Sequence, residues 1–168
     1  MLMQSANEAA SIVADYLGDG SIAYFAEMMT KRAKELGCTG TNFTNPHGLF
    51  DENNYTTAKD MYLIAKHAIS IPGFLEIAST THYEVGSTNI HDSLAWNTTN
   101  KMMVKGTEYY YSPVKGLKTG TLDESGKCFV STASLDGFDY LCVVMGAPIL
   151  DDENGKEIGN NAFADTKA

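Results

Sequence analysis

The sequence predicts a mixed fold of the α/β (α+β) class, in which helices come first and an antiparallel sheet follows. Segments within residues 1–80 carry apolar residues at helical spacing, and three strand-like segments lie within 110–148. With 168 residues, of which 43% are apolar and 20% charged, the chain is long enough for one domain with its own core. We therefore expect a single domain over 1–168, with a mainly helical lobe at 1–80, a sheet at 110–148 and the start of a C-terminal helix at 157–168.

The helical part consists of three main helices that turn and capping residues separate. Ser21 and Thr57 are placed to cap the second and third helices, because each precedes an apolar pattern of helical period. Gly37 and Pro72 follow these helices and end them. The segments predicted to be helical are 7–17, 21–36 and 57–71, with one or two further turns at 74–79.

The strands form a predicted antiparallel meander with segments at 114–121, 127–135 and 138–145. Asp136-Gly137 is a strong hairpin signal between the last two strands. The last strand is apolar on both side-chain parities at its centre, which predicts that both of its faces are covered. Only one neighbouring strand is available to it, so we expect one edge of 138–146 to have no partner. Segment 82–105 shows only strand fragments and polar loops.

Charge and hydropathy exclude several classes of function. Twelve Lys and Arg against 21 Asp and Glu give a net charge of -9, which argues against a nucleic-acid partner. The longest apolar stretch, 140–148, is far shorter than the ~20 residues of a membrane-spanning helix. No signal-peptide pattern or membrane anchor is visible in the sequence.

The cysteines and histidines give no sign of a metal site. Neither the three cysteines nor the four histidines have the spacing of metal ligands, and an odd number of cysteines does not suggest a disulfide framework. We expect no metal and no cofactor. These residues are Cys38, Cys128, Cys142, His47, His67, His82 and His91.

Ser5-Ala6-Asn7 is the first candidate for chemistry. Ser-x-Asn is a weak pattern by itself, because two common residues at fixed spacing arise by chance in many chains. A structural alternative is equally open at this point: Ser5 followed by Glu8 fits a Ser-x-x-Glu capping box at the start of a helix.

Lys118-Thr119-Gly120 is the more specific candidate, and it lies on the first predicted strand of the meander. The structural alternative is an ordinary strand with an exposed lysine and a glycine that contributes no side chain to one face. In a binding site the glycine has a use as well, because the backbone of an extended substrate can approach a strand closely where there is no side chain.

The two motifs together point to a known motif set. Ser-x-x-Lys, a Ser-x-Asn-like element and Lys-Thr-Gly occur together in penicillin-binding proteins and class A β-lactamases. The sequence resembles the low-molecular-mass serine D-alanyl-D-alanine carboxypeptidases of that β-lactamase/transpeptidase-like superfamily. The resemblance covers nearly the whole chain and includes Asn45-Pro46-His47-Gly48-Leu49, Thr57-Ala58-Lys59-Asp60-Met61 and Gly116-Leu117-Lys118-Thr119-Gly120. It implies a three-layer fold, incomplete here, with a helical lobe and a three-stranded antiparallel meander flanked by helices.

The chain departs from the family at the nucleophile. In the family a Ser-x-x-Lys motif lies upstream of the Ser-x-Asn element, and only four residues precede Ser5 here. Ser112-Pro113-Val114-Lys115 has the same letters, but it adjoins the Lys-Thr-Gly strand and cannot face that strand across a cleft. We therefore expect no nucleophile in this chain, and no acyl transfer by the chain alone. Two smaller departures are Ala6 and Leu122, which replace residues common in relatives.

The resemblance implies a role for each motif residue. Ser5 would relay a proton to the leaving amine, and Asn7 would hold the amide of the acyl side. Lys118 would supply positive charge and Thr119 a hydroxyl for the terminal carboxylate of the substrate. Gly120 would let that substrate approach the strand, and the backbone N–H of Thr121 would be one oxyanion donor.

The expected function of the parent protein is removal of the terminal D-alanine from peptidoglycan stem peptides through an acyl-enzyme. β-Lactam antibiotics would bind to it, and it would work outside the cytoplasmic membrane, in the bacterial cell envelope. Two alternatives stay open: a non-catalytic binding or scaffold fragment, and a class A-like β-lactamase. The unpaired strand edge at 138–146 further predicts that the chain either self-associates through this edge or is partly unfolded.

Overall fold

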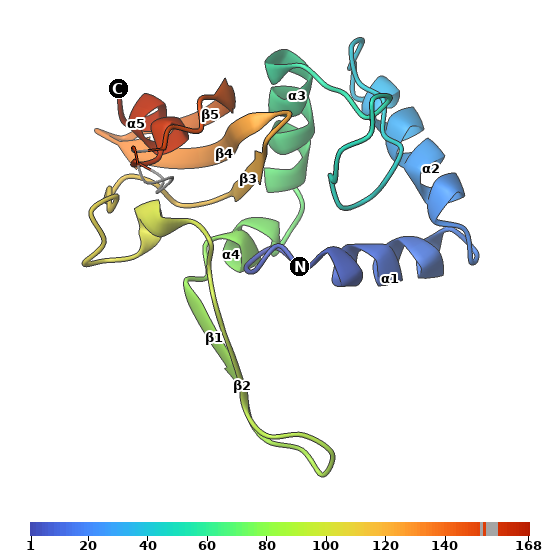
Figure 1. Ribbon diagram of the computed structural model, residues 1–168, viewed down its shortest axis with the longest axis horizontal. Helices are drawn as coiled ribbons and strands as arrows, with labels where there is room; N and C mark the ends of the chain where they lie inside the picture. Colours follow the sequence, from blue (N-terminus) through green and yellow to red (C-terminus); the bar gives the residue numbers. More distant parts are fainter. Residues whose placement is uncertain (152, 154–157) are drawn as a thin grey trace.

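The computed structural model describes residues 1–151, 153 and 158–168. Helices and two antiparallel sheets make up the fold (Figure 1). The helices are α1 (Asn7–Leu17), α2 (Ile22–Glu35), α3 (Ala58–Ile69), α4 (Phe74–Ala78), the 3-10 helix η1 (Lys101–Met103) and α5 (Asn161–Lys167). The strands are β1 (His82–Val85), β2 (Leu94–Asn97), β3 (Lys118–Leu122), β4 (Gly126–Leu135) and β5 (Phe138–Ala147). The predicted helices and the predicted meander are confirmed.

The two predicted helix caps are both present. The hydroxyl of Ser21 accepts a hydrogen bond from the Tyr24 N–H at 3.2 Å, and the hydroxyl of Thr57 accepts one from the Asp60 N–H at 3.1 Å. Each satisfies a backbone donor that has no partner within its own helix. The starts of α2 and α3 are therefore set by local sequence.

The main sheet has the strand order β3-β4-β5 and is antiparallel throughout. Asp136 and Gly137 both have positive φ, 52° and 81°, as a two-residue hairpin turn requires, and the flanking Leu135 and Phe138 are paired. The first strand begins later than predicted, at Lys118 instead of 114. Residues 113–117 still run along β4: Val114 forms an isolated bridge with Ala133, and the N–H groups of Lys115 and Leu117 donate to β4 carbonyls, but they do not form regular strand pairing.

The sheet is the middle of three layers. On one face Phe129 packs against Phe163 of α5, with ring centroids 5.0 Å apart, in a cluster that includes Met102 and Val144. On the other face Ala65 of α3, Ala78 of α4 and Leu117 form a second buried cluster, with Val130 and Leu141 packed against it. The predicted three-layer arrangement is thus confirmed, and β5 has contacts on both faces as its sequence predicts.

The outer edge of β5 has no strand partner within 1–151, 153 and 158–168. Apolar side chains are also exposed at the start of β5, directly after the hairpin turn, where Phe138 is 67% and Tyr140 52% accessible. On α1, Ile12 and Tyr16 are 70% and 82% accessible. The chain therefore exposes apolar surface on α1 and β5.

The structure resolves the segment that sequence patterns left unassigned. β1 and β2 form an antiparallel hairpin, which extends away from the other elements in Figure 1. The C-terminal helix expected at 157–168 is present as α5, which begins at Asn161. Residue 157, where it was expected to start, lies outside the described residues, as do 152 and 154–156.

Candidate functional site

Lys118 and Thr119 lie at the start of β3. The Lys118 ammonium donates a hydrogen bond to the Thr119 carbonyl at 2.6 Å, and the side chain is half-buried. Burial lowers the pKa of Lys118 below its ordinary value, because the charged form loses hydration. In the described part of the chain no strand pairs with the free edge of β3, so an extended ligand has a strand edge to lie against.

A short run of hydrogen bonds connects this strand to the N-terminal segment. The hydroxyl oxygens of Thr119 and Thr99 are 2.7 Å apart, and the Thr99 N–H donates to the Met3 carbonyl at 3.0 Å. Thr99 thus contacts both the Lys-Thr-Gly strand and the segment that carries Ser5 and Asn7. In Figure 1 the N-terminus is seen below β3.

Ser5 does not cap a helix. The N-cap of α1 is Ala6, without a side-chain cap hydrogen bond, so the capping-box alternative for Ser5 and Glu8 is wrong. Ser5 has a φ of 58°, in the left-handed region that a residue with a Cβ adopts only at some cost. The Ser5 hydroxyl and the Asn7 amide form no hydrogen bonds with the described residues, which leaves both available to a ligand or to another segment.

Gly120 and Thr121 complete the exposed part of β3. A methyl group on Gly120 would meet only the Cβ of Cys128, at 4.0 Å, which is ordinary contact. The fold itself therefore does not require glycine at this position. The open space beside Gly120 is available to a ligand.

Thr99 and Asn100 are the residues of this region that sequence reasoning missed. Asn100 is buried; its amide donates to the Gly116 carbonyl at 3.2 Å and its side-chain oxygen accepts from the Met102 N–H at 3.1 Å. It holds the segment before β3 against the segment after β2. The one available signal was the polar run Asn97 to Asn100 between apolar segments, which gives no clue to its partners.

The Ser112-x-x-Lys115 sequence does not form a second site. The ammonium of Lys115 donates to the backbone carbonyl of Ser112 at 3.2 Å, not to its hydroxyl. Backbone bonds from Lys115 to Thr132 and from Ser134 to Pro113 hold this segment along β4, in line with β3. It therefore cannot face β3 across a cleft.

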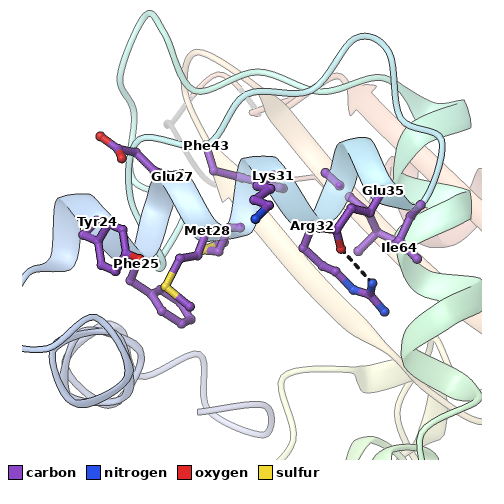
Figure 2. Close-up of a pocket in the computed structure, with 12 residues that line it drawn as sticks. Tyr24, Phe25, Glu27, Met28, Lys31, Arg32, Glu35, Phe43 and Ile64 are labelled. Atoms are coloured by element: carbon purple, nitrogen blue, oxygen red, sulfur yellow. Dashed lines mark hydrogen bonds and ion pairs between the residues drawn. The ribbon is translucent and has the colours of Figure 1, made fainter.

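A hollow of about 810 Å³ lies on α2, away from β3. Figure 2 shows Phe25 and Met28 of α2 and, from other elements, Phe43 and Ile64 around it. Arg32 and Glu35 form an ion pair of 2.9 Å at its rim. The apolar stripe of α2 thus borders open space, and the hollow brings together no residue of the two motifs.

In the described residues, no group of three or more His, Cys, Asp or Glu side chains is placed to hold a metal ion. Among their helices, none has the length and apolar character needed to cross a bilayer.

Comparisons with known proteins agree on one family. The family model described as D-alanyl-D-alanine carboxypeptidase matches residues 1–149. The chain is 31% identical over 152 residues to the D-alanyl-D-alanine carboxypeptidase DacF of Bacillus subtilis, covering 90% of this chain and 37% of the relative. The chain therefore spans about a third of the length of this curated relative.

Solved structures show the same fold. Penicillin-Binding Protein D2 of Listeria monocytogenes, in its ampicillin-bound form, matches with a TM-score of 0.75 and 31% identity over 99% of this chain and 61% of that one. The Streptomyces K15 DD-transpeptidase matches with a TM-score of 0.78 and 27% identity, over 88% of this chain and 58% of that one. With the family model covering nearly nine-tenths of its length, this chain belongs to the D-alanyl-D-alanine carboxypeptidase family.

Proposed function

We propose that this chain supplies the Ser-x-Asn and Lys-Thr-Gly elements of a serine D-alanyl-D-alanine carboxypeptidase that trims peptidoglycan stem peptides and binds β-lactams. The observation that carries the proposal is the connection from Met3 through Thr99 to Thr119, because it brings the two motif segments of the family together. Ser5 and Lys118 are 113 residues apart in the sequence, and this connection places their two segments next to each other, as a shared site requires.

In this proposal β3 binds the C-terminal end of the substrate. The Lys118 ammonium provides positive charge for the terminal carboxylate of the peptide, and the Thr119 hydroxyl donates a hydrogen bond to it. The substrate backbone lies along the free edge of β3, where Gly120 leaves room for it. The Thr121 N–H is one of two donors to the oxyanion.

Ser5 and Asn7 act on the scissile bond. A nucleophilic serine attacks the carbonyl between the two D-alanines, the C–N bond breaks, and the terminal D-alanine leaves with a proton that Ser5 relays. Asn7 holds the amide of the acyl part while water completes hydrolysis. The unusual backbone conformation of Ser5 and its unpaired hydroxyl support such a role, because strained residues often lie at functional sites.

The proposal assigns no nucleophile to the 168 residues themselves. We propose that the 168 residues have no acyl-transfer activity, and that a Ser-x-x-Lys segment must be added to them. The exposed apolar residues of α1, those of β5 and the apolar hollow on α2 support this, because apolar surface of this kind often marks contact with another segment or protein. By the same proposal the complete enzyme works in the bacterial cell envelope, outside the cytoplasmic membrane.

The test is a comparison of two reactions by a version of the chain extended upstream in its gene through a Ser-x-x-Lys motif. Release of D-alanine from diacetyl-Lys-D-Ala-D-Ala, with slow turnover of a chromogenic cephalosporin, is the expected result. Rapid cephalosporin turnover without release of D-alanine would identify a β-lactamase. Absence of both reactions, with no covalent penicillin adduct, would identify a scaffold and overturn the proposal.

A further inference from the structure

The β1–β2 hairpin has one polar face that is held together internally. The two ring nitrogens of His82 lie 2.8 Å from the side-chain oxygen of Asn97 and 2.9 Å from a carboxylate oxygen of Glu84. These three side chains alternate with the others along the strands and therefore lie on the same face. Their hydrogen-bonding groups are already engaged with one another.

The opposite face is aromatic and aliphatic. Tyr83 and Trp96 are directly paired across the strands, with ring centroids 6.2 Å apart and an angle of 11° between the ring planes. Val85 and Leu94 form the next pair toward the tip on this face. Tyr83 is 54% and Leu94 44% accessible, so this face is open to a ligand.

The charge around the hairpin limits what that ligand can be. Residues 82–100 contain no lysine or arginine, while Glu84 and Asp92 are acidic. Phosphate groups and anionic lipid surfaces are recognised through clusters of Lys and Arg, so neither fits this surface. A neutral ligand with both apolar and hydroxyl groups does.

The hairpin begins at the candidate site. Its base is closed by a hydrogen bond of 2.9 Å from the Thr98 N–H to the Thr81 carbonyl, and Thr99, which contacts Thr119, follows directly. Trp96 lies three residues before Thr99, so the two are separated by at most about 10 Å of extended chain. A ligand bound on β3 therefore has the aromatic pair within reach of its distal part.

We propose that Tyr83 and Trp96 form a binding platform for a neutral glycan strand of N-acetylated amino sugars. The identity of the glycan rests on the proposed function, because the stem peptide that would lie on β3 is attached to such a strand. The aromatic faces carry partial negative charge, which attracts the C–H groups on the flat side of a sugar ring. Thr81 is exposed and lies two residues before Tyr83, a spacing that puts both side chains on the same face of an extended segment, so its hydroxyl can reach the sugar hydroxyls.

The single tryptophan of the chain makes the test direct, because all tryptophan emission comes from Trp96. We would titrate the 168-residue chain with a soluble tetramer of N-acetylglucosamine, which contains no peptide and needs no catalytic residue. The expected result is a saturable change in emission at about millimolar concentration, a weak affinity suited to a few ring contacts. No change in emission would overturn the inference.

Variants of Tyr83 separate sugar stacking from simple burial. Tyr83→Leu keeps an apolar side chain but removes the ring, and should weaken the affinity about fivefold, whereas Tyr83→Phe should keep it. Tyr16→Leu, on the exposed face of α1, is the matched control and should leave the affinity unchanged. Equal affinities of the wild type and Tyr83→Leu would contradict the inference.

Two outcomes distinguish this inference from other accounts. Trp96 emission that changes with protein concentration in the absence of sugar would show that a second copy of the chain covers the face with Tyr83 and Trp96. That result would overturn the glycan assignment. Tetramer binding by a chain whose extended form releases no D-alanine would leave the platform standing and contradict only the proposed function.

Discussion

The hydroxyl of Thr99 contacts the hydroxyl of Thr119 at 2.7 Å, although Thr99 belongs to neither sequence motif. A side chain this close restricts the rotamers of Thr119 and fixes the direction in which its hydroxyl points. In the proposed enzyme, that direction decides whether the hydroxyl can donate to a substrate carboxylate. Thr99 is therefore a positioning residue.

The corresponding prediction concerns Thr99→Val in the extended chain. Loss of the hydroxyl should lower the rate of acylation by penicillin about tenfold, equivalent to about 1.4 kcal/mol, the upper range for one hydrogen bond. Thr99→Ser should restore the rate, and Thr166→Val, which removes a hydroxyl from α5, should have no effect. A serine variant as slow as the valine variant would contradict a role for the hydroxyl.

Lys118 illustrates a conflict between stability and binding at a single residue. Burial lowers its pKa, so around the folded-state pKa the unfolded chain binds more protons than the folded chain, and stability rises with pH there. Lys118→Met removes the buried charge. Thermal unfolding at pH 7 should move up by about 2 °C in this variant.

The pH dependence checks the sign of this effect. The stability difference between Lys118→Met and the wild type should shrink as the pH rises through the lowered folded-state pKa toward the ordinary lysine value of 10.5. Lys105→Met, at an exposed position, serves as the control. A difference that grows with pH would contradict the account.

At the scale of elements, one buried carboxylate holds the long loop between α2 and α3. Asp60, in the first turn of α3, accepts hydrogen bonds of 2.7 Å from the Gly40 N–H and from the Thr41 hydroxyl. The Thr41 hydroxyl bond in particular lowers the pKa of Asp60. The ionised form is thus the one that fixes the loop.

We expect Asp60→Asn to unfold at a lower temperature than the wild type at pH 7, by about 5 °C, because it loses the charge that these donors face. A lowered carboxyl pKa gives stability that is present above the ordinary pKa and is lost as the pH falls through the folded-state value. The two proteins should therefore converge in acid, as followed by circular dichroism. Asp15→Asn, on exposed α1, is the control, and a constant difference at every pH would contradict the prediction.

Elements with local signals could be predicted from the sequence. Caps at Ser21 and Thr57 and the turn at Asp136-Gly137 depend on neighbouring residues, so these elements were predicted correctly. The start of β3 was placed too early because residues 114–117 run along β4 without regular strand pairing, and the Gly116 carbonyl among them accepts from the Asn100 side chain, 16 residues away. A contact between distant segments leaves no periodic trace in the sequence.

In the candidate site, too, features marked by local sequence could be predicted and contacts between distant segments could not. Lys118 and Ser5 were found through motifs, but the contact that joins their segments runs through Thr99, which no motif marks. The aromatic pair of the β1–β2 hairpin was also out of reach, because the hairpin has a loop of eight residues, 86–93, instead of a two-residue turn.

At the scale of the whole molecule, apolar surface remains uncovered on several elements. The edge of β5 that has no strand partner among the described residues presents backbone donors and acceptors next to exposed Phe138 and Tyr140. Such an edge pairs readily with another strand, so we expect the 168-residue chain to self-associate through it.

Light scattering coupled to size-exclusion chromatography checks this prediction. Tyr140→Lys places a charge beside the edge and should shift the chain toward the monomer. Tyr16→Lys removes an equally exposed tyrosine from α1 and should not. A wild-type chain that is monomeric at all concentrations would contradict self-association through β5.

In the proposed enzyme, the catalytic residues are divided between this chain and an added Ser-x-x-Lys segment. The most direct measurement is gel-based labelling by a fluorescent penicillin of the 168-residue chain and of the version extended upstream. We predict that only the extended version is labelled, and that Lys118→Met weakens its labelling. Labelling of the 168-residue chain itself would place a nucleophile within these residues, with Ser112 the first to be tested, and would contradict the account.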